Sequence, residues 1–312
     1  MEPVIANYRI PFEQEDQWQE HLKREGFVVV ANYLPQAECN EYVAKSWDIM
    51  EHLAEGKLNR KDQSTQKLSN CYPPVLHGGM IQYVGHSQLQ WDLRKRCKPI
   101  FARIWQTDKL KTSFDGFCFM NGVRNYKPRP ADSFMHCDQS GMKDYLWSYQ
   151  GLISLTDCDR DGGGFVVVPR SHLYHHEFMA KKKLLEKKDD WYLMEEKDKL
   201  EAPFKHHIKL DTLAGDFILW DSRTFHCNTV PTTPTLRICV YICMLPSKKI
   251  PENIQKKREK GVVDRRTSTH HPGDGFRLFP VLPRFVQDRD HFLELVQDIN
   301  TFKSDKEIED MI

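Results

Sequence analysis

The sequence lacks the features of two large protein classes. No stretch approaches the roughly 18 consecutive apolar residues of a membrane-spanning helix, and no basic start followed by an apolar run marks a secretory signal. An excess of one charge is also missing, because 45 Lys and Arg face 44 Asp and Glu for a net charge of +1. Coating a phosphate backbone needs a large basic excess. We therefore expect neither a membrane span nor a nucleic-acid partner.

Paired cysteine motifs are absent as well. The nine cysteines are an odd number and form no CxxC pair. They lie at positions 39, 71, 97, 118, 137, 158, 227, 239 and 243. Scattered cysteines in strand-like segments behave as small buried apolar residues in a reducing compartment. We expect nine free thiols and a cytoplasmic location, with the nucleus as the alternative.

Material for a hydrophobic core is plentiful. Hydrophobic residues make up 40% of the chain and aromatic residues 11%, which excludes disorder as the dominant state. A length of 312 residues allows one large domain or two average ones. No internal repeat and no Ser- or Gly-rich linker divides the chain. We therefore expect a single domain over residues 1–312.

The first third of the chain, residues 1–111, is expected to form a helical layer. Apolar residues recur at helical spacing over 36–54 and 88–108, and more weakly over 13–25. Residues 55–87 are rich in Gly, Pro, Asn and Ser, which is typical of a long loop.

Residues 112–246 change character and predict a β core. Short apolar runs alternate there with turn residues, a pattern typical of a sandwich or open barrel. A Lys-, Glu- and Asp-dense stretch at 176–205 predicts a solvated helical insertion. Residues 247–312 form a C-terminal extension with polar helices expected at 252–260 and 287–298. The expected fold class is mainly β with flanking helices.

Three residues in the β core carry the pattern of a metal site. His136 and Asp138 stand one residue apart in a strand-like segment, so their side chains point to the same face. A later strand-like run delivers His226 at its far end. Two imidazoles and one carboxylate on a rigid scaffold form the facial triad that binds Fe(II) and leaves the opposite face open for a co-substrate and O₂.

Arg237 adds a candidate binding site for that co-substrate. Ten residues separate it from His226, and it opens an otherwise apolar strand. A guanidinium is costly to bury without an anionic partner, and its planar fork grips a carboxylate with two hydrogen bonds. The distal carboxylate of 2-oxoglutarate is such a partner. Each of these features occurs by chance in other chains, but their combination in this order is far more specific.

With these motifs the chain resembles the phytanoyl-CoA dioxygenase family of Fe(II)/2-oxoglutarate-dependent oxygenases over roughly residues 20–246. The segment 161–172 is similar to the family's glycine-rich VxPGSH segment, and 26–35 is similar to its N-terminal strand and helix start. One departure is Arg170, which stands where the family has glycine. A positive φ at that position would favour glycine, so the turn could differ.

The resemblance implies a fold, a reaction and one further residue. The fold is a double-stranded β-helix of the jelly-roll, cupin-like type. The reaction is hydroxylation of a C–H bond with release of succinate and CO₂, using Fe(II), 2-oxoglutarate and O₂. Asn228, two positions after His226, is implied to help hold 2-oxoglutarate. Asp138 favours hydroxylation, because related halogenases carry a small residue in place of this carboxylate.

Two other functions stay open at this point. A cupin-type enzyme uses the same three ligands without 2-oxoglutarate, and a binding protein keeps the fold without turnover. The substrate, a small molecule or an acyl or peptidyl group, is not identified. Residues 264–284 combine aromatic, Pro, hydroxyl and His side chains in a segment with little regular structure, which makes them the best candidate for a substrate cap.

Other conspicuous residues have ordinary interpretations. The pairs His175-His176 and His206-His207 flank the charged insertion and are expected to be solvated. The basic residues of 247–266 are expected to form a solvated tail. Ser171-His172 is expected to be structural, because adjacent side chains on an extended segment point apart.

Overall fold

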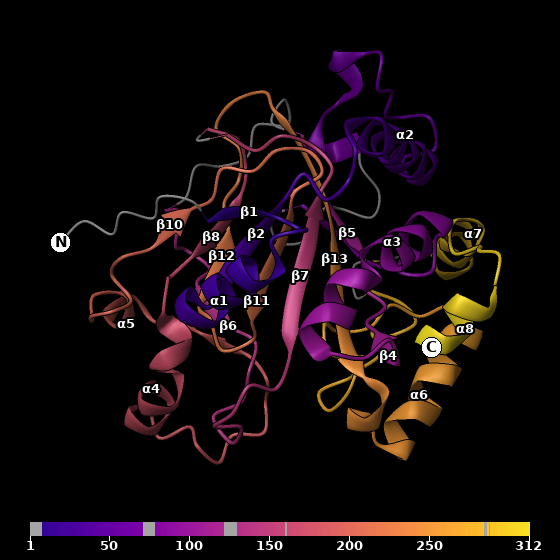
Figure 1. Ribbon diagram of the computed structural model, residues 1–312. Helices are drawn as coiled ribbons and strands as arrows, with labels where there is room; N and C mark the ends of the chain where they lie inside the picture. Colours follow the sequence, from indigo (N-terminus) through magenta and orange to yellow (C-terminus); the bar gives the residue numbers. More distant parts are fainter. Residues whose placement is uncertain (1–7, 71–78, 122–129, 160, 284–285, 287) are drawn as a thin grey trace.

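Two β-sheets lie at the centre of the computed structural model, which describes residues 8–70, 79–121, 130–159, 161–283, 286 and 288–312 (Figure 1). The larger sheet runs, in order, β1 (Arg9–Pro11), β2 (Phe27–Ala31), β11 (Phe217–Asp221), β7 (Tyr149–Ser154), β13 (Leu236–Pro246), β5 (Phe117–Asn121) and β3 (Met80–Ile81), with β4 (Leu110–Thr112) also paired to β13. The smaller sheet runs β10 (Ile208–Lys209), β8 (Phe165–Val167), β12 (His226–Asn228), β6 (His136–Cys137) and β9 (Tyr192–Leu193). Apart from the parallel pair β1–β2, neighbouring strands are antiparallel.

Helices flank the sheets on both sides. They are α1 (Glu15–Glu25), α2 (Gln36–Leu53), α3 (Gln88–Trp105), α4 (His175–Lys181), α5 (Glu196–Lys199), α6 (Glu252–Val263), α7 (Arg289–Ile299) and α8 (Lys306–Met311). Short 3₁₀ turns span Gln63–Thr65, Leu68–Asn70, Ser171–Leu173 and Ser247–Lys249. Figure 1 shows α3, α6, α7 and α8 gathered on one side of the sheets and α4 and α5 on the other. None of the helices in the described ranges is both long and apolar enough to span a membrane.

Strand alternation divides the apolar residues among three clusters. On β2, Val28 and Val30 pack toward the helical layer, whereas Phe27 and Val29 pack into the space between the sheets. On β8, Phe165 and Val167 face the same inter-sheet space, and the intervening residue joins a third cluster under α4. The layers are therefore helix, sheet, sheet and helix. The inter-sheet space is the part of the fold that concerns function.

The predicted fold class is confirmed: the protein is built mainly of sheets with flanking helices, and the described strands do not close into a barrel. The predicted helices at 36–54, 252–260 and 287–298 correspond to α2, α6 and α7. The helix predicted to reach residue 108 ends at Trp105, because Gln106 adopts a left-handed conformation at φ 52°. Helix α8 was not predicted, since six residues carry too little periodicity.

The charged insertion at 176–205 differs from the solvated helix that was expected. Helix α4 opens it and α5 lies near its end, but the strand β9 between them pairs with β6, next to His136. The residues just before β9 therefore reach the inter-sheet space. The sequence did not predict this strand for two reasons. Two residues are too few to show a period of two, and the charged residues around them favour a solvated segment.

Two further expectations about polar residues are corrected. His175 is buried rather than solvated, and its Nε2 lies 3.0 Å from the Gln139 carbonyl oxygen. The basic stretch 247–266 is not a free tail, because Arg258 is fully buried. Its guanidinium donates to four backbone carbonyl oxygens, those of Thr112, Pro272, Met311 and Ile312. This anchor holds the C-terminal extension against the β core.

Arg170 keeps the turn in which the family carries glycine. Its φ is 63°, the left-handed region that glycine occupies without cost. The side chain makes a bidentate ion pair with Glu25, with both N···O distances at 2.9 Å. The backbone shape is therefore the same as glycine would give, and arginine adds a link to α1. Ser171 and His172 are buried within this turn, in agreement with a structural role.

All eight cysteines among the described residues are buried free thiols, as expected, and Cys71 lies outside those residues. Cys118 of β5 stands directly opposite Cys239 of β13 in the ladder, and both belong to the inter-sheet cluster.

Candidate metal centre

The three predicted metal ligands meet in the inter-sheet space. His136 on β6 is the cross-strand partner of His226 on β12, so the two rings lie side by side with centroids 4.4 Å apart. Asp138 follows β6 on the same face. Its Oδ2 lies 3.9 Å from His136 Nε2 and 3.6 Å from His226 Nε2. All three ligand atoms lie within 4.8 Å of one another, and all three residues are buried.

Backbone carbonyls orient both imidazole rings. His136 Nδ1 lies 2.8 Å from the Phe134 oxygen, and His226 Nδ1 lies 2.9 Å from the Thr224 oxygen. A proton on each Nδ1 leaves Nε2 with a free lone pair that points toward Asp138. Burial, and then the neighbouring His226 ring, lower the pKa of His136 to about 4, which keeps that ring neutral as a metal ligand must be.

The Asp138 carboxylate is held by a residue that the sequence did not reveal. Gln150 on β7 donates from Nε2 to Asp138 Oδ2 at 2.9 Å and accepts from Trp220 Nε1 at 2.8 Å. Burial opposes ionisation of Asp138, but the two imidazoles outweigh it and hold the pKa of the carboxyl well below its usual range. A glutamine in a strand carries no sequence signal for this role, which depends on the pairing of β7 with β11.

Arg237 is buried, as its place at the start of an apolar strand suggested, with 4% of the residue exposed. Its Nη2 donates to Asn228 Oδ1 at 2.8 Å, and its Nη1 contacts Cys118 Sγ at 3.5 Å. No carboxylate lies within ion-pair distance of Arg237 in the described part of the chain. Asn228 lines the cavity next to the three candidate ligands, and Arg237 is linked to this wall through its bond to Asn228.

Tyr241 supplies a further polar group on the same face of β13 as Arg237. Residues 237 and 241 are four positions apart on one strand, so their side chains share a face. The Tyr241 hydroxyl is buried, and the neighbouring Cys118 and Cys239 thiols offer it only weak hydrogen bonds. A buried hydroxyl without a strong partner is costly unless a ligand completes it. A buried cation without a carboxylate and a weakly paired hydroxyl together fit a bound carboxylic acid such as 2-oxoglutarate.

A cavity of about 370 Å³ opens in front of the three candidate ligands. Several chain segments line it, including Phe134, Trp191 of the charged insertion, Tyr241, and residues 268–271, 277 and 279 of the C-terminal extension. Its volume lies at the small end of the range for small-molecule pockets. Trp191 and the C-terminal residues are positioned by tertiary contacts. Of this part of the wall, the sequence predicted only the C-terminal residues, through the expected cap at 264–284, and gave no sign of Trp191.

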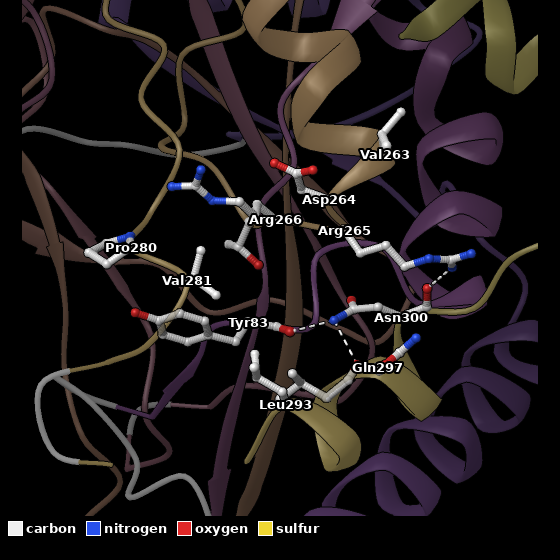
Figure 2. A pocket seen from close by; sticks show the side chains of 12 residues that line it. Tyr83, Val263, Asp264, Arg265, Arg266, Pro280, Val281, Leu293, Gln297 and Asn300 are labelled. Carbon is white, nitrogen blue, oxygen red and sulfur yellow. Dashed lines mark hydrogen bonds between the residues drawn. The ribbon is translucent and has the colours of Figure 1, made fainter. Parts of the chain in front are cut away.

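A second hollow, of about 280 Å³, lies away from these residues (Figure 2). It is lined by Tyr83, the end of α6, residues 280–281 and α7. Asn300 Nδ2 donates to the Tyr83 carbonyl oxygen at 2.7 Å, and the Arg265 guanidinium donates to the Asn300 carbonyl oxygen. These bonds join secondary-structure elements, and the hollow shares no lining residue with the cavity at the candidate ligands.

Comparison with known proteins agrees with this geometry. The chain is 26% identical over 283 residues to the "Ava biosynthesis cluster protein O" of Aspergillus versicolor, covering 84% of this chain and 88% of that protein. It is 21% identical over 272 residues to a putative phytanoyl-CoA dioxygenase of Dictyostelium discoideum, covering 74% and 75%.

The fold is also found among solved structures. The non-heme alpha-ketoglutarate-dependent carbocyclase SnoK of nogalamycin biosynthesis superposes with a TM-score of 0.52 at 15% identity, covering 87% of this chain and 99% of SnoK. The model of the phytanoyl-CoA dioxygenase (PhyH) family matches residues 22–238, well over half of the sequence. The chain therefore belongs to the phytanoyl-CoA dioxygenase family and is an oxidoreductase that uses iron and 2-oxoglutarate.

Proposed function

We propose that this protein hydroxylates a C–H bond of a small molecule and converts 2-oxoglutarate and O₂ to succinate and CO₂ in the process. His136, Asp138 and His226 are the proposed iron ligands. The observation that carries the proposal is the convergence of their ligand atoms. Two donors bound to one ion at about 2.1 Å each can be no more than about 4.2 Å apart. The Asp138 oxygen meets this limit with both imidazole nitrogens, at 3.9 and 3.6 Å.

The chain's own groups bind, orient and shield in this proposal. When bound, iron together with 2-oxoglutarate supplies the oxidising chemistry. Arg237 and Asn228 hold the distal carboxylate, and the Tyr241 hydroxyl is a further donor on the same wall. Gln150 fixes the direction of the Asp138 carboxylate. Retention of this carboxylate favours hydroxylation over halogenation.

The proposed substrate class follows from the cavity. A volume of about 370 Å³ that also accommodates 2-oxoglutarate leaves room for a small molecule. The Aspergillus relative is named as a protein of a biosynthesis cluster, which supports a small organic substrate over a macromolecule.

The proposal extends to the C-terminal segment 264–284 as a substrate cap within a single functional unit. Six of its residues line the cavity: Ser268, Thr269, His270, His271, Arg277 and Phe279. Position 284 lies outside the described residues.

The test combines iron binding with product formation. His136→Ala, Asp138→Ala and His226→Ala should each lose stoichiometric Fe(II) binding and all succinate formation while circular dichroism stays unchanged. His291→Ala, which removes an exposed ring paired with Glu55, is the matched control and should behave as wild type. Full turnover in Asp138→Ala without an added anion would show that the proposed ligands are wrong.

Two further results would replace the proposal. Turnover of a substrate without consumption of 2-oxoglutarate would identify a cupin-type enzyme. Stoichiometric iron with no succinate under any substrate tested would identify a binding protein.

A further inference from the structure

The C-terminal loop, residues 268–279, is fixed firmly enough to present side chains in set directions. Thr269 N donates to the Arg277 carbonyl oxygen at 2.9 Å, and Thr269 Oγ1 accepts from Arg277 N at 3.1 Å. Phe114 N donates to Ser268 Oγ at 2.9 Å, and Ser268 N donates back to the Phe114 carbonyl oxygen at 3.1 Å. The loop thus has no regular secondary structure but is closed on itself and attached to the β core.

His270 on this loop is paired with a carboxylate of the core. Its Nδ1 lies 3.0 Å from Asp115 Oδ1, an ion-pair distance without the alignment of a straight hydrogen bond. Asp115 also accepts the Ser113 hydroxyl. The Tyr241 ring packs edge-on against the imidazole at a centroid distance of 5.1 Å. Asp115 and Tyr241 thus fix the ring directly, and Ser113 holds the Asp115 carboxylate.

The other ring nitrogen of His270 is left for a ligand. Nε2 has no hydrogen-bond partner in the described ranges, and the side chain is 21% exposed where it borders the cavity. Pairing with a carboxylate favours the imidazolium, in which both nitrogens are donors. A buried ion pair adds little to stability compared with apolar residues of the same volume. The position of the His270–Asp115 pair beside the candidate metal ligands is therefore better explained by a role in binding a ligand in the cavity.

The cavity also presents aromatic faces. Trp191 lines it and remains 39% exposed, and its ring lies 6.1 Å from that of Phe134 and 6.3 Å from that of His136. Phe279 of the C-terminal loop contributes another ring to the lining. Flat aromatic side chains that are left uncovered suit a ring-shaped apolar body.

We propose that His270, oriented by Asp115, donates a hydrogen bond from Nε2 to a carbonyl or carboxylate oxygen of the substrate, whose ring body packs against Trp191, Phe134 and Phe279. This inference rests on the proposed function of the cavity and names its substrate class: a small ring-containing ketone or carboxylic acid. The donor is pre-organised, because the ring cannot turn away without breaking its pair with Asp115.

The test uses three probes of similar size on the full chain loaded anaerobically with Fe(II) and 2-oxoglutarate. 3-Phenylpropionate and 4-phenyl-2-butanone carry the acceptor oxygen, and butylbenzene lacks it. Ligand-observed NMR titration should show that wild type binds both oxygen-bearing probes at least tenfold more tightly than butylbenzene. His270→Phe, which keeps a ring but has no donor, and the isosteric Asp115→Asn should lose this preference, and His291→Phe should keep it.

Several results would overturn the inference: equal affinity for the three probes, no saturable binding of either oxygen-bearing probe to wild type, or an unchanged preference in a folded His270→Phe protein. If that variant does not fold, Asp115→Asn decides in its place. Failure of the proposed function is a separate observation, because it would remove the absorption band of the Fe(II)–2-oxoglutarate complex in wild type before any probe is added.

Discussion

Gln150 shows how much of the proposed metal centre depends on one uncharged side chain. Its amide joins the Asp138 carboxylate to the Trp220 indole, so a single group fixes the direction of a ligand and completes a buried donor. Groups that orient metal ligands typically contribute 10- to 100-fold to metal affinity.

We predict that Gln150→Leu lowers Fe(II) affinity by about 10- to 100-fold, because the carboxylate is no longer held toward the two imidazoles. Competition with a chromophoric chelator measures the change. Gln90→Leu is the matched control, since Gln90 is fully buried on α3 and its amide has no hydrogen-bond partner among the described residues. An equal effect of the two substitutions would contradict the role given to Gln150.

Arg237 yields a graded prediction. Lysine keeps the charge but offers a point contact instead of a fork, so Arg237→Lys should weaken 2-oxoglutarate binding. Arg237→Ala should weaken it further, by about two orders of magnitude at roughly 1.4 kcal/mol per tenfold. The metal-to-ligand charge-transfer band of the anaerobic Fe(II) complex reports the affinity.

Iron affinity should change little in both Arg237 variants, because the guanidinium is not a proposed ligand. Arg96→Ala, which removes a half-exposed ion pair with Glu38, serves as the control. Unchanged 2-oxoglutarate affinity in Arg237→Ala would favour the cupin-type alternative.

At the scale of elements, two opposing contributions to stability meet at the Arg170 turn: strain in the backbone and an ion pair of the side chain. Its left-handed φ of 63° costs about 1 kcal/mol for any residue with a Cβ. The ion pair with Glu25 offsets this cost in part: the Arg170 side chain is 58% exposed, whereas that of Glu25 is 9% exposed. A glycine at this position would have no strain and no pair.

We predict that Arg170→Gly is more stable than Arg170→Ala by about 1 kcal/mol in urea unfolding, because both lose the pair but only alanine keeps the strain. At Arg96, inside α3, the order should invert, with alanine more stable than glycine by about 1 kcal/mol. If alanine were more stable than glycine at position 170 as well, the left-handed turn would not be retained in solution.

At the scale of the whole molecule, buried groups join the C-terminal extension to the N-terminal layer. His86, just before α3, is fully buried, its backbone N donates to Asn300 Oδ1 at 2.9 Å, and its Nε2 lies 3.0 Å from the Arg266 carbonyl oxygen. Arg258 makes a parallel link through its four carbonyl contacts. These bonds attach the described part of the C-terminal extension to the N-terminal layer and to the β core.

This docking predicts a pH dependence. Burial, together with the nearby Arg94, lowers the pKa of His86 to about 3, against about 6.5 in the unfolded chain. The unfolded chain therefore takes up the proton first as the pH falls. The contribution of His86 is fully present above pH 6.5 and is lost toward pH 3, by up to about 1.4 kcal/mol per pH unit.

His86→Phe keeps an aromatic ring and removes the titration. Urea unfolding of the metal-free protein should give a pH dependence between pH 5.5 and 4.5 that is about 1 kcal/mol per unit flatter than in wild type. Above pH 7 the two proteins should respond to pH in parallel. Identical slopes below pH 6 would show that His86 is already protonated in the folded state.

Much of the architecture could be predicted, because it depends on local patterns. Helix α2 follows from apolar spacing at a period of 3.6 and strand β2 from a short continuous apolar run rich in valine, and the residues concerned are buried. The prediction of a solvated helix for the charged insertion was wrong in part. The two-residue strand β9 is stabilised by its pairing with β6 and not by its own composition. Helix α8 was missed for a similar reason, because tertiary packing stabilises such a short helix.

The residues proposed to bind iron and 2-oxoglutarate were identifiable from the chain alone, because metal and carboxylate ligands need particular residue types at spacings that strand alternation sets. His136 and Asp138 share a face by that rule, and Arg237 stands out as a charge on an apolar strand. The groups around them were decided by tertiary structure. Gln150, Tyr241 and the His270–Asp115 pair are ordinary in sequence. Strand register places Gln150 against the Asp138 carboxylate, and strand register together with a tethered loop brings Tyr241 and the His270–Asp115 pair to one cavity. There the cost of burying an incomplete polar group points to a ligand.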